Sequence, residues 1–417
     1  MLTPNVRGSA VIPVATVSFV TAVYISMPFI AAVIGYVTKL VAIRMMFQPI
    51  RFVGIPPFLG WQGVVPRNSE RMIRVSAELL TTRLVDPKEI FARLDPEQVT
   101  REIEGPLLLA VDEVAREVLE RYHPALWELL PVLAQDLIVK QVQAGTPAMV
   151  RRIMTEIREN IEDVLDIKQV AVSALERDKE LLVRLVRDIS RPEMAFLARC
   201  GIYFGLILGC VQTAVWALTH EPLVLPVFGA AVGLLTDWLA IKLVFFPRQR
   251  TRILGIVPFQ GIFQRRRDEV ARQYGELVAR EVMTVPNIVD GILRGPKSDR
   301  LITMIQRIVQ RTVDEQAAIA KPFVSVAIGP RRFQEMKHAA ADKAVRYLAS
   351  TALHAKDYAT SAMDVADTIE RRMRRLSRVE YEGLLRPAFR QDEWKLIAVG
   401  AIIGALVGEL QAVLLLG

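Results

Sequence analysis

Apolar residues gather in four long runs, and two long polar stretches separate them. The runs cover about residues 11–35, 201–218, 222–246 and 396–416. A helix that crosses a bilayer needs ~20 mostly apolar residues, so each run predicts a membrane span. The first run lacks a small-residue cleavage pattern before a polar segment, so it does not predict a signal peptide.

The polar stretches have the periodicity of amphipathic helices. Apolar residues recur every three to four positions over 146–165, and the same pattern returns over 299–313. Asp86 and Asp95 each precede a proline, which is the composition of a helix start with an N-cap and proline at the first helical position. Alternating strand patterns are absent, so the sequence predicts an all-α protein.

The two halves of the chain repeat one another at a nearly constant offset. Residues 35–49 and 233–247 share the pattern Gly-x-x-Thr-x-x-x-Ala-Ile-Lys/Arg-x-x-Phe-x-Pro, 198 positions apart (233 minus 35). Three glycines near the end of each half also match, 199 positions apart: Gly201, Gly205 and Gly209 against Gly400, Gly404 and Gly408. Such an offset predicts a tandem duplication.

Each predicted repeat contains two spans and the polar helical stretch between them, which we call its arm. Because each repeat has two spans, both repeats take the same orientation in the membrane. The first repeat covers residues 11–218, with spans at about 11–35 and 201–218 and an arm at 48–195. The second covers 222–417, with spans at about 222–246 and 396–416 and an arm at 247–394. The predicted fold is an all-α integral membrane protein with about four transmembrane helices, two long cytoplasmic helical regions and an internal parallel duplication.

The positive charge is concentrated beside the spans, on one side. The chain has 53 Lys and Arg against 45 Asp and Glu, a net charge of +8. Basic residues flank the arms at Arg51, Arg67, Arg71, Arg74, Arg191, Arg199, Arg248, Arg250, Arg252, Arg265, Arg266, Arg267, Arg272, Arg386, Arg390 and Lys395. The link 219–221 has no Lys or Arg. The positive-inside rule therefore predicts a multi-pass protein of the cell inner membrane with cytoplasmic arms. No nucleic-acid-binding fold or basic-aromatic interleaving is present.

Glycines at every fourth position predict close contacts between helices in the membrane. The three glycines of each repeat lie on one helix face, and Gly35 and Gly233 extend the pattern to the first span of each repeat. Small residues let helix backbones approach one another. A substrate path lined by glycine is the alternative interpretation.

Several charged residues lie within or at the edges of the apolar runs. Lys39 and Asp237 occupy equivalent positions about two turns inside, and we expect them to pair. The alternative is that each side chain reaches the cytoplasmic interface separately. Arg44 and Lys242 lie nearer the ends, where long side chains snorkel to water, and Glu409 is expected at the opposite interface.

The shared pattern resembles the sequence motif near the start of the domain in the domain of unknown function 445 family of bacterial membrane proteins. The residues that carry the resemblance are Thr38, Arg44 and Pro49 in the first repeat and Thr236, Lys242 and Pro247 in the second. The resemblance also covers residues 256–271 and 380–400, and it implies a membrane location and a helical fold without an activity. The family usually has Asn directly after the Thr, where this chain has Lys39 and Asp237.

Two apolar turns follow the shared pattern, at residues 54–60 and 255–261. Basic residues come after each turn. One interpretation places both turns in the layer of lipid headgroups. The other makes each a tight turn packed on the first helix of its arm.

No residue pattern predicts catalysis or a cofactor. Two cysteines, Cys200 and Cys210, and four histidines have no spacing typical of a metal site, and no Walker, dinucleotide or HExxH motif is present. We therefore expect a non-enzymatic protein that organises or tethers the envelope through arms that bind lipid, with anionic headgroups favoured, or a protein partner. A transporter of lipid or small solute is the alternative. The oligomeric state stays open.

Overall fold

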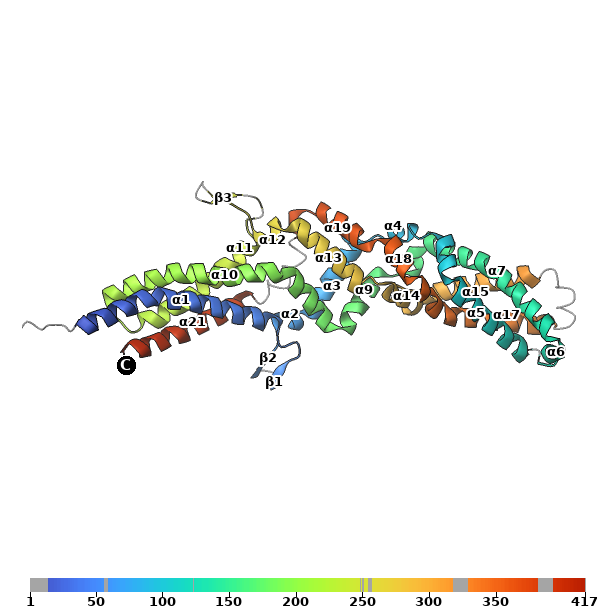
Figure 1. The fold of residues 1–417 in the computed structure, drawn as a ribbon, viewed down its shortest axis with the longest axis horizontal. Helices are drawn as coiled ribbons and strands as arrows, with labels where there is room; N and C mark the ends of the chain where they lie inside the picture. The colour runs from blue at the N-terminus through green and yellow to red at the C-terminus, as the bar shows by residue number, and fades with distance from the viewer. Residues whose placement is uncertain are drawn as a thin grey trace, which may run out of the picture. The chain divides into compact units, whose positions relative to one another are not determined.

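The computed structural model describes residues 14–55, 59–122, 124–247, 249, 251–253, 257–317, 329–381 and 393–416. Nearly all of this part of the chain is helical, which confirms the all-α prediction (Figure 1). Some predicted features lie outside the described residues: positions 11–13 of the first run, residues 56–58 and 254–256 of the two apolar turns, Arg248, Arg250, residues 382–392 with Arg386 and Arg390, and Gly417.

The chain divides into two compact units. We call the first the span unit: Met1–Ser69, Leu182–Arg267 and Ser377–Gly417. Its elements are α1 (Val14–Phe47), β1 (Val53–Ile55), β2 (Leu59–Trp61), α2 (Val64–Arg67), α10 (Lys179–Thr219), α11 (Val224–Phe245), β3 (Thr251–Ile253), β4 (Val257–Phe259), α12 (Ile262–Arg265) and α21 (Glu393–Leu416).

We call the second the arm unit: Glu70–Leu181 and Asp268–Leu376. Its elements are α3 (Ser69–Leu79), the π-helical turn η1 (Leu80–Leu84), α4 (Pro87–Ala92), α5 (Pro96–Tyr122), α6 (Pro124–Leu129), α7 (Val132–Glu159), α8 (Ile161–Val164), α9 (Ile167–Arg177), α13 (Arg267–Glu281), α14 (Val285–Arg294), α15 (Ser298–Ala317), α17 (Pro330–Ala352), the short 3₁₀ turn η2 (Leu353–Ala355), α18 (Lys356–Met363) and α19 (Val365–Arg375).

Three of the described helices are long and apolar enough to cross a membrane. They include Tyr24–Phe47 of α1, Glu180–Thr219 of α10 and Val224–Val244 of α11. The apolar part of α21, Ile397–Val413, is shorter. Within the span unit α11 packs along α21, and α1 contacts both of them.

Helix α10 runs through the boundary that the sequence predicts between the first arm and the following span. The sequence ends the first arm at residue 195 and starts the next span at 201, whereas α10 continues without a break through Pro192. The reason is a continuous apolar face, because Leu182, Val186 and Ile189 are buried at helical spacing before the apolar run begins.

The arm unit begins its helices where the sequence predicts. Asp86 accepts a hydrogen bond from the Lys88 amide at 3.0 Å and caps α4, and Asp95 does the same for the Glu97 amide at 3.0 Å before α5. The two predicted N-caps are therefore confirmed. Helices α5, α7, α15 and α17 pack against one another in this unit (Figure 1).

An ionic contact joins residues of the arm unit that are far apart in the sequence. The Arg372 guanidinium donates to Glu89 at 2.5 Å and lowers the pKa of that carboxyl below its usual value. Arg93 of the first half also donates to Glu89, at 2.9 Å, and to the Thr368 hydroxyl, at 2.9 Å. The arm unit is thus one structure built from both halves of the chain.

Two small hairpins correct the expectation that strand structure is absent. Strand β1 pairs antiparallel with β2, with Val53 opposite Trp61 and Ile55 opposite Leu59. Strand β3 pairs antiparallel with β4 in the corresponding place after α11. Each strand has only three residues, which is too short for alternation to show in the sequence.

Candidate functional site

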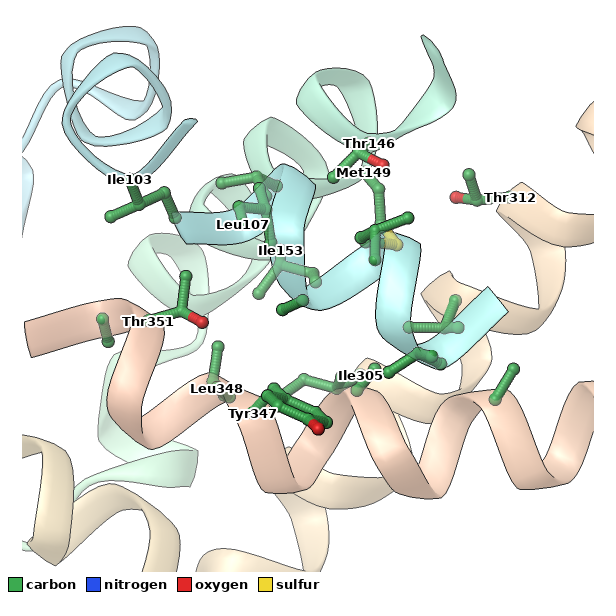
Figure 2. A pocket seen from close by; sticks show the side chains of 18 of the residues that line it. Ile103, Leu107, Thr146, Met149, Ile153, Ile305, Thr312, Tyr347, Leu348 and Thr351 are labelled. Atoms are coloured by element: carbon green, nitrogen blue, oxygen red, sulfur yellow. The ribbon is translucent and has the colours of Figure 1, made fainter. Parts of the chain in front are cut away.

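A large cavity lies inside the arm unit. Its volume is about 730 Å³, and its wall comes mainly from α5, α7, α14, α15 and α17. Figure 2 shows Ile103 and Leu107 of α5, Ile153 of α7, Ile305 of α15 and Leu348 of α17 around it. The cavity falls in the 300–1,000 Å³ range of ligand-binding sites in proteins.

The cavity wall is almost entirely hydrocarbon, and both halves of the chain supply it. Residues between 91 and 157 form one part and residues between 285 and 363 the other. Val, Ile, Leu, Ala and Met side chains predominate. The polar side chains of the wall are Gln141, Thr146, Thr312, Gln316, Lys337, Tyr347 and Thr351.

Four of the polar wall residues are hydrogen-bonded within the protein. The hydroxyls of Thr146 and Thr312 donate to the carbonyl four residues earlier in their own helices, at 3.2 and 2.9 Å. Gln141 donates to the side chain of Gln316 at 3.1 Å. The two threonine hydroxyls therefore have their donors in use, and the bond between the glutamines uses one donor and one acceptor of the two amides.

The charged group in the wall is also paired within the protein. Lys337 is buried, and its ammonium donates to both carboxylate oxygens of Asp314 at 3.0 Å. The same ammonium lies 5.4 Å from the centre of the Phe333 ring. The pKa of Tyr347 is raised because its hydroxyl is hydrogen-bonded to Glu113.

A second candidate site is the buried charge pair of the span unit. The structure brings Lys39 of α1 and Asp237 of α11 together in an ion pair, with side chains only 3% and 6% exposed. Lys39 also donates to the Thr236 hydroxyl at 2.8 Å. Asp237 Oδ2 is buried and has no hydrogen-bond partner among the described residues. A side chain added at Gly400 would overlap that oxygen.

The two charged residues lie equally far from the ends of their helices. Each is eight positions before the last residue, Phe47 in α1 and Phe245 in α11 (47 minus 39 and 245 minus 237). At 1.5 Å per residue this is ~12 Å of helix. A charge at that distance from the helix end needs its partner, since a lone charge among apolar helices is costly.

The predicted glycines lie at contacts between helix backbones. Gly35 of α1 meets Gly201 of α10, and Gly233 of α11 meets Gly400 of α21, so closely that an added Cβ would overlap a carbonyl oxygen. The remaining four show the same closeness to a neighbouring backbone or side chain: Gly205, Gly209, Gly404 and Gly408. The absence of a side chain is what allows these approaches.

The other residues of the shared pattern occupy the end of each first helix. Thr38 and Thr236 are buried, and each hydroxyl donates to a glycine carbonyl three residues earlier, at 3.1 and 3.2 Å. Arg44 and Lys242 are exposed in the last turns of α1 and α11. The Lys242 ammonium lies 4.2 Å from the centre of its own helix's Trp238 ring. Pro49 and Pro247 are half-buried just after those helices, and Glu409 is exposed on α21.

The sequence did not predict the cavity, and it did not predict the contact between the Gln212 and Gln411 side chains. The side chains of Gln212 and Gln411 are buried and meet at 3.4 Å in the span unit. The two glutamines occupy equivalent positions in the two halves, and this equivalence could have predicted their contact. The cavity residues form the apolar stripes of the arms, and a stripe alone does not distinguish a filled core from a hollow one.

The fold and its apolar helices define the chain as a helical membrane protein, and its homologues agree. They are UPF0754 membrane proteins of bacteria. A UPF0754 membrane protein of Synechococcus sp. (strain JA-3-3Ab) is 22% identical over 94% of this chain and 99% of that protein. The UPF0754 membrane protein alr5253 of Nostoc sp. is 35% identical over 22% of this chain and 23% of its own length.

A shorter match has the same description. The UPF0754 membrane protein YheB of Bacillus subtilis (strain 168) is 32% identical over 20% of this chain, and the alignment spans 23% of that relative. These names state a location and no activity. No family model and no solved structure matches the chain, so the resemblance to the domain of unknown function 445 family stays a prediction.

Proposed function

We propose that this membrane protein binds lipid, holding hydrocarbon chains in the cavity of the arm unit, and that this binding serves a non-enzymatic role in organising the cell envelope. The observation that carries the proposal is the apolar cavity of about 730 Å³. Its wall combines residues from both halves of the chain, so the two arms form one binding site.

An empty cavity of this size is energetically unfavourable. Covering its hydrocarbon wall is favourable, because apolar surface removed from water contributes about 25 cal/mol per Å². Water is a poor filling, because ordered water needs two to four polar partners and the wall offers few free ones. A hydrocarbon ligand removes the apolar wall from water and needs no polar partners.

The chemistry of the wall also indicates which part of a lipid is bound. Thr146 and Thr312 are bonded to their own helices, and Lys337 is neutralised by Asp314. A ligand headgroup placed inside would lose its hydration and gain few partners. We therefore infer that acyl chains enter the cavity and that the headgroup stays outside, at a gain of ~0.8 kcal/mol per buried methylene.

A photoactivatable lipid with a diazirine in its acyl chain tests this proposal. After ultraviolet irradiation of membranes that contain the protein, we expect cross-linked peptides from α5, α7, α15 and α17 as well as from the lipid-facing spans. Replacing both Ala110 and Ala344 of the wall by Trp gives a chain that we call the Trp variant. The two rings take up part of the cavity and should reduce the arm cross-links. The matched control is Ala125→Trp, at an exposed alanine outside the wall.

The span cross-links serve as the internal standard of this experiment. Arm peptides that stay unlabelled while span peptides are labelled would contradict lipid binding in the cavity. Equal labelling of the arm in the Trp variant and in the control would mean that the lipid binds outside the cavity. Native mass spectrometry of the extracted protein then gives the mass and stoichiometry of the bound lipid.

We further propose four spans and a tandem duplication. The fourth span would be α21, whose apolar part Ile397–Val413 is the shorter one. Three observations support the duplication: the constant sequence offset, the matching hairpins after α1 and α11, and the contact of the equivalent residues Lys39 and Asp237. Two spans per repeat give both repeats one orientation.

A transporter of lipid or small solute is the second candidate. The observation that favours it is the buried ion pair of the span unit with one unsatisfied carboxylate oxygen on Asp237. The close backbone contacts at Gly35 and Gly233 favour a packed interior instead. Lipid exchange by reconstituted protein that is lost in Asp237→Asn and kept in the Trp variant would favour the transporter.

The orientation proposed from the charge pattern has a direct test. In a variant without its native cysteines, Cys at Glu221, in the exposed link between α10 and α11, should react with an impermeant reagent in intact cells. Cys at the exposed Glu97 of the arm unit should react only after the inner membrane is opened. Labelling of Glu97→Cys in intact cells would overturn cytoplasmic arms in the inner membrane. Arg266 is unsuitable because its guanidinium contacts Glu193 at 2.7 Å.

A further inference from the structure

The first hairpin is attached directly to the end of α1. The indole nitrogen of Trp61 donates to the carbonyl of Met45, in the last turn of α1, at 3.3 Å. The Gln62 side chain donates to the carbonyl of Ile50 at 2.9 Å. These bonds hold the base of the hairpin against the end of a helix that is long and apolar enough to span a membrane.

Strand β1 and Phe52 just before it present large apolar side chains that the described part of the chain leaves exposed. Phe52 is 42% exposed, Val53 is 62% exposed and Ile55 is 71% exposed. A lone two-stranded hairpin is marginal in water even with favourable residues. Contiguous exposed apolar side chains mark a surface that contacts a membrane or another protein.

Geometry indicates the bilayer as the contact. Five residues, 48–52, connect Phe47 to Val53, and a chain of that length reaches at most ~18 Å. The hydrogen bond to Met45 holds the hairpin closer still. Trp61 therefore lies at the level where α1 leaves the apolar layer, which is where Trp is enriched in membrane proteins. The exposed Arg51 beside the hairpin suits anionic headgroups.

We propose that the β1–β2 hairpin is a membrane-contact element, with Val53 and Ile55 inserted at the boundary between the headgroups and the acyl chains of the bilayer that α1 crosses. This contact is separate from the cavity of the arm unit. The hairpin covers the membrane surface beside the span and fixes the depth of α1. The β3–β4 hairpin follows α11 in the same way.

The test uses a fluorescent label at the hairpin. A variant with Cys200→Ala, Cys210→Ala and Ile55→Cys is labelled with an environment-sensitive fluorophore and placed in nanodiscs of phosphatidylcholine and phosphatidylglycerol. The replaced Ile55 is exposed, so its packing contribution is small. A lipid nitroxide near the headgroup should quench about half of the fluorescence, because an interfacial element lies ~5–10 Å into the boundary. Aqueous iodide should quench little.

A second label shows that the assay reports lipid contact. Ile207 is 59% exposed and lies on α10 within the apolar run. A fluorophore on Ile207→Cys should be quenched more by a nitroxide near the end of the acyl chain than by one near the headgroup. Strong quenching of the Ile55 label by iodide without quenching by the lipid nitroxide would overturn the proposal. Protection of that label from both quenchers would also overturn it, because a protein surface would then cover the hairpin.

Discussion

Lys39→Asn and Asp237→Asn are each expected to destabilise the extracted protein strongly, and the double variant is expected to regain much of the loss. Each single change leaves one buried charge without its partner, since the two side chains form an ion pair and are 3% and 6% exposed. Removing one member of a buried pair costs ~3–5 kcal/mol. Two neutral amides at the same place can bond to each other.

Thermal unfolding of the wild type, both single variants and the double variant forms a double-mutant cycle. A coupling energy of ~2 kcal/mol or more is expected for such a pair. Additivity within ~0.5 kcal/mol would contradict direct coupling. Lys242→Asn is the matched control, because this lysine is exposed and its ammonium lies over the ring of Trp238, so its replacement should cost less than ~1 kcal/mol.

Gly205→Leu and Gly404→Leu should each lower the melting temperature of the extracted protein. A Cβ at Gly205 would lie 2.6 Å from the carbonyl oxygen of Ala31, and one at Gly404 would overlap the carbonyl oxygen of Gly229. These neighbours are backbone atoms and cannot rotate away. Overpacking costs ~1–3 kcal/mol or more, and at ~2–4 °C per kcal/mol we expect a loss of roughly 2–12 °C.

The control for the glycine variants is Ala214→Leu, on the exposed face of the same helix as Gly205. The added side chain lies at an exposed position, so the melting temperature of this variant should change little. Unchanged melting in both glycine variants would mean that these helices separate without cost, which conflicts with the contacts of α1 with α10 and of α11 with α21. Equal losses in Ala214→Leu would indicate a general effect of added bulk.

Much of the span unit could be predicted because membrane helices leave local signals. Long apolar runs predict α1, α10 and α11, and the spacing of Gly201 and Gly205 predicts a face where another helix approaches. The equivalence of positions 39 and 237 predicted which charges could meet. Helix starts at Asp86 and Asp95 followed from cap chemistry, which depends on only a few neighbouring residues.

The hairpins were harder to predict because their stability is not local. Three-residue strands have no detectable alternation, and what holds the first hairpin is the bond from Trp61 to Met45, sixteen positions earlier. The sequence predicted an apolar turn at residues 54–60 and left its surroundings open. Exposure of Val53 and Ile55 depends on what the rest of the chain covers, and only the folded structure contains that information.

By itself, the sequence determined that the chain is helical, which segments are apolar enough to enter a membrane, and which face of each arm helix is apolar. Only the tertiary structure decided that the apolar faces around Ile153 and Ile305 enclose a cavity instead of closing into a solid core. The periodicity of a helix fixes the direction of its side chains. It does not fix the distance between helices, which depends on how all of the surrounding side chains pack together.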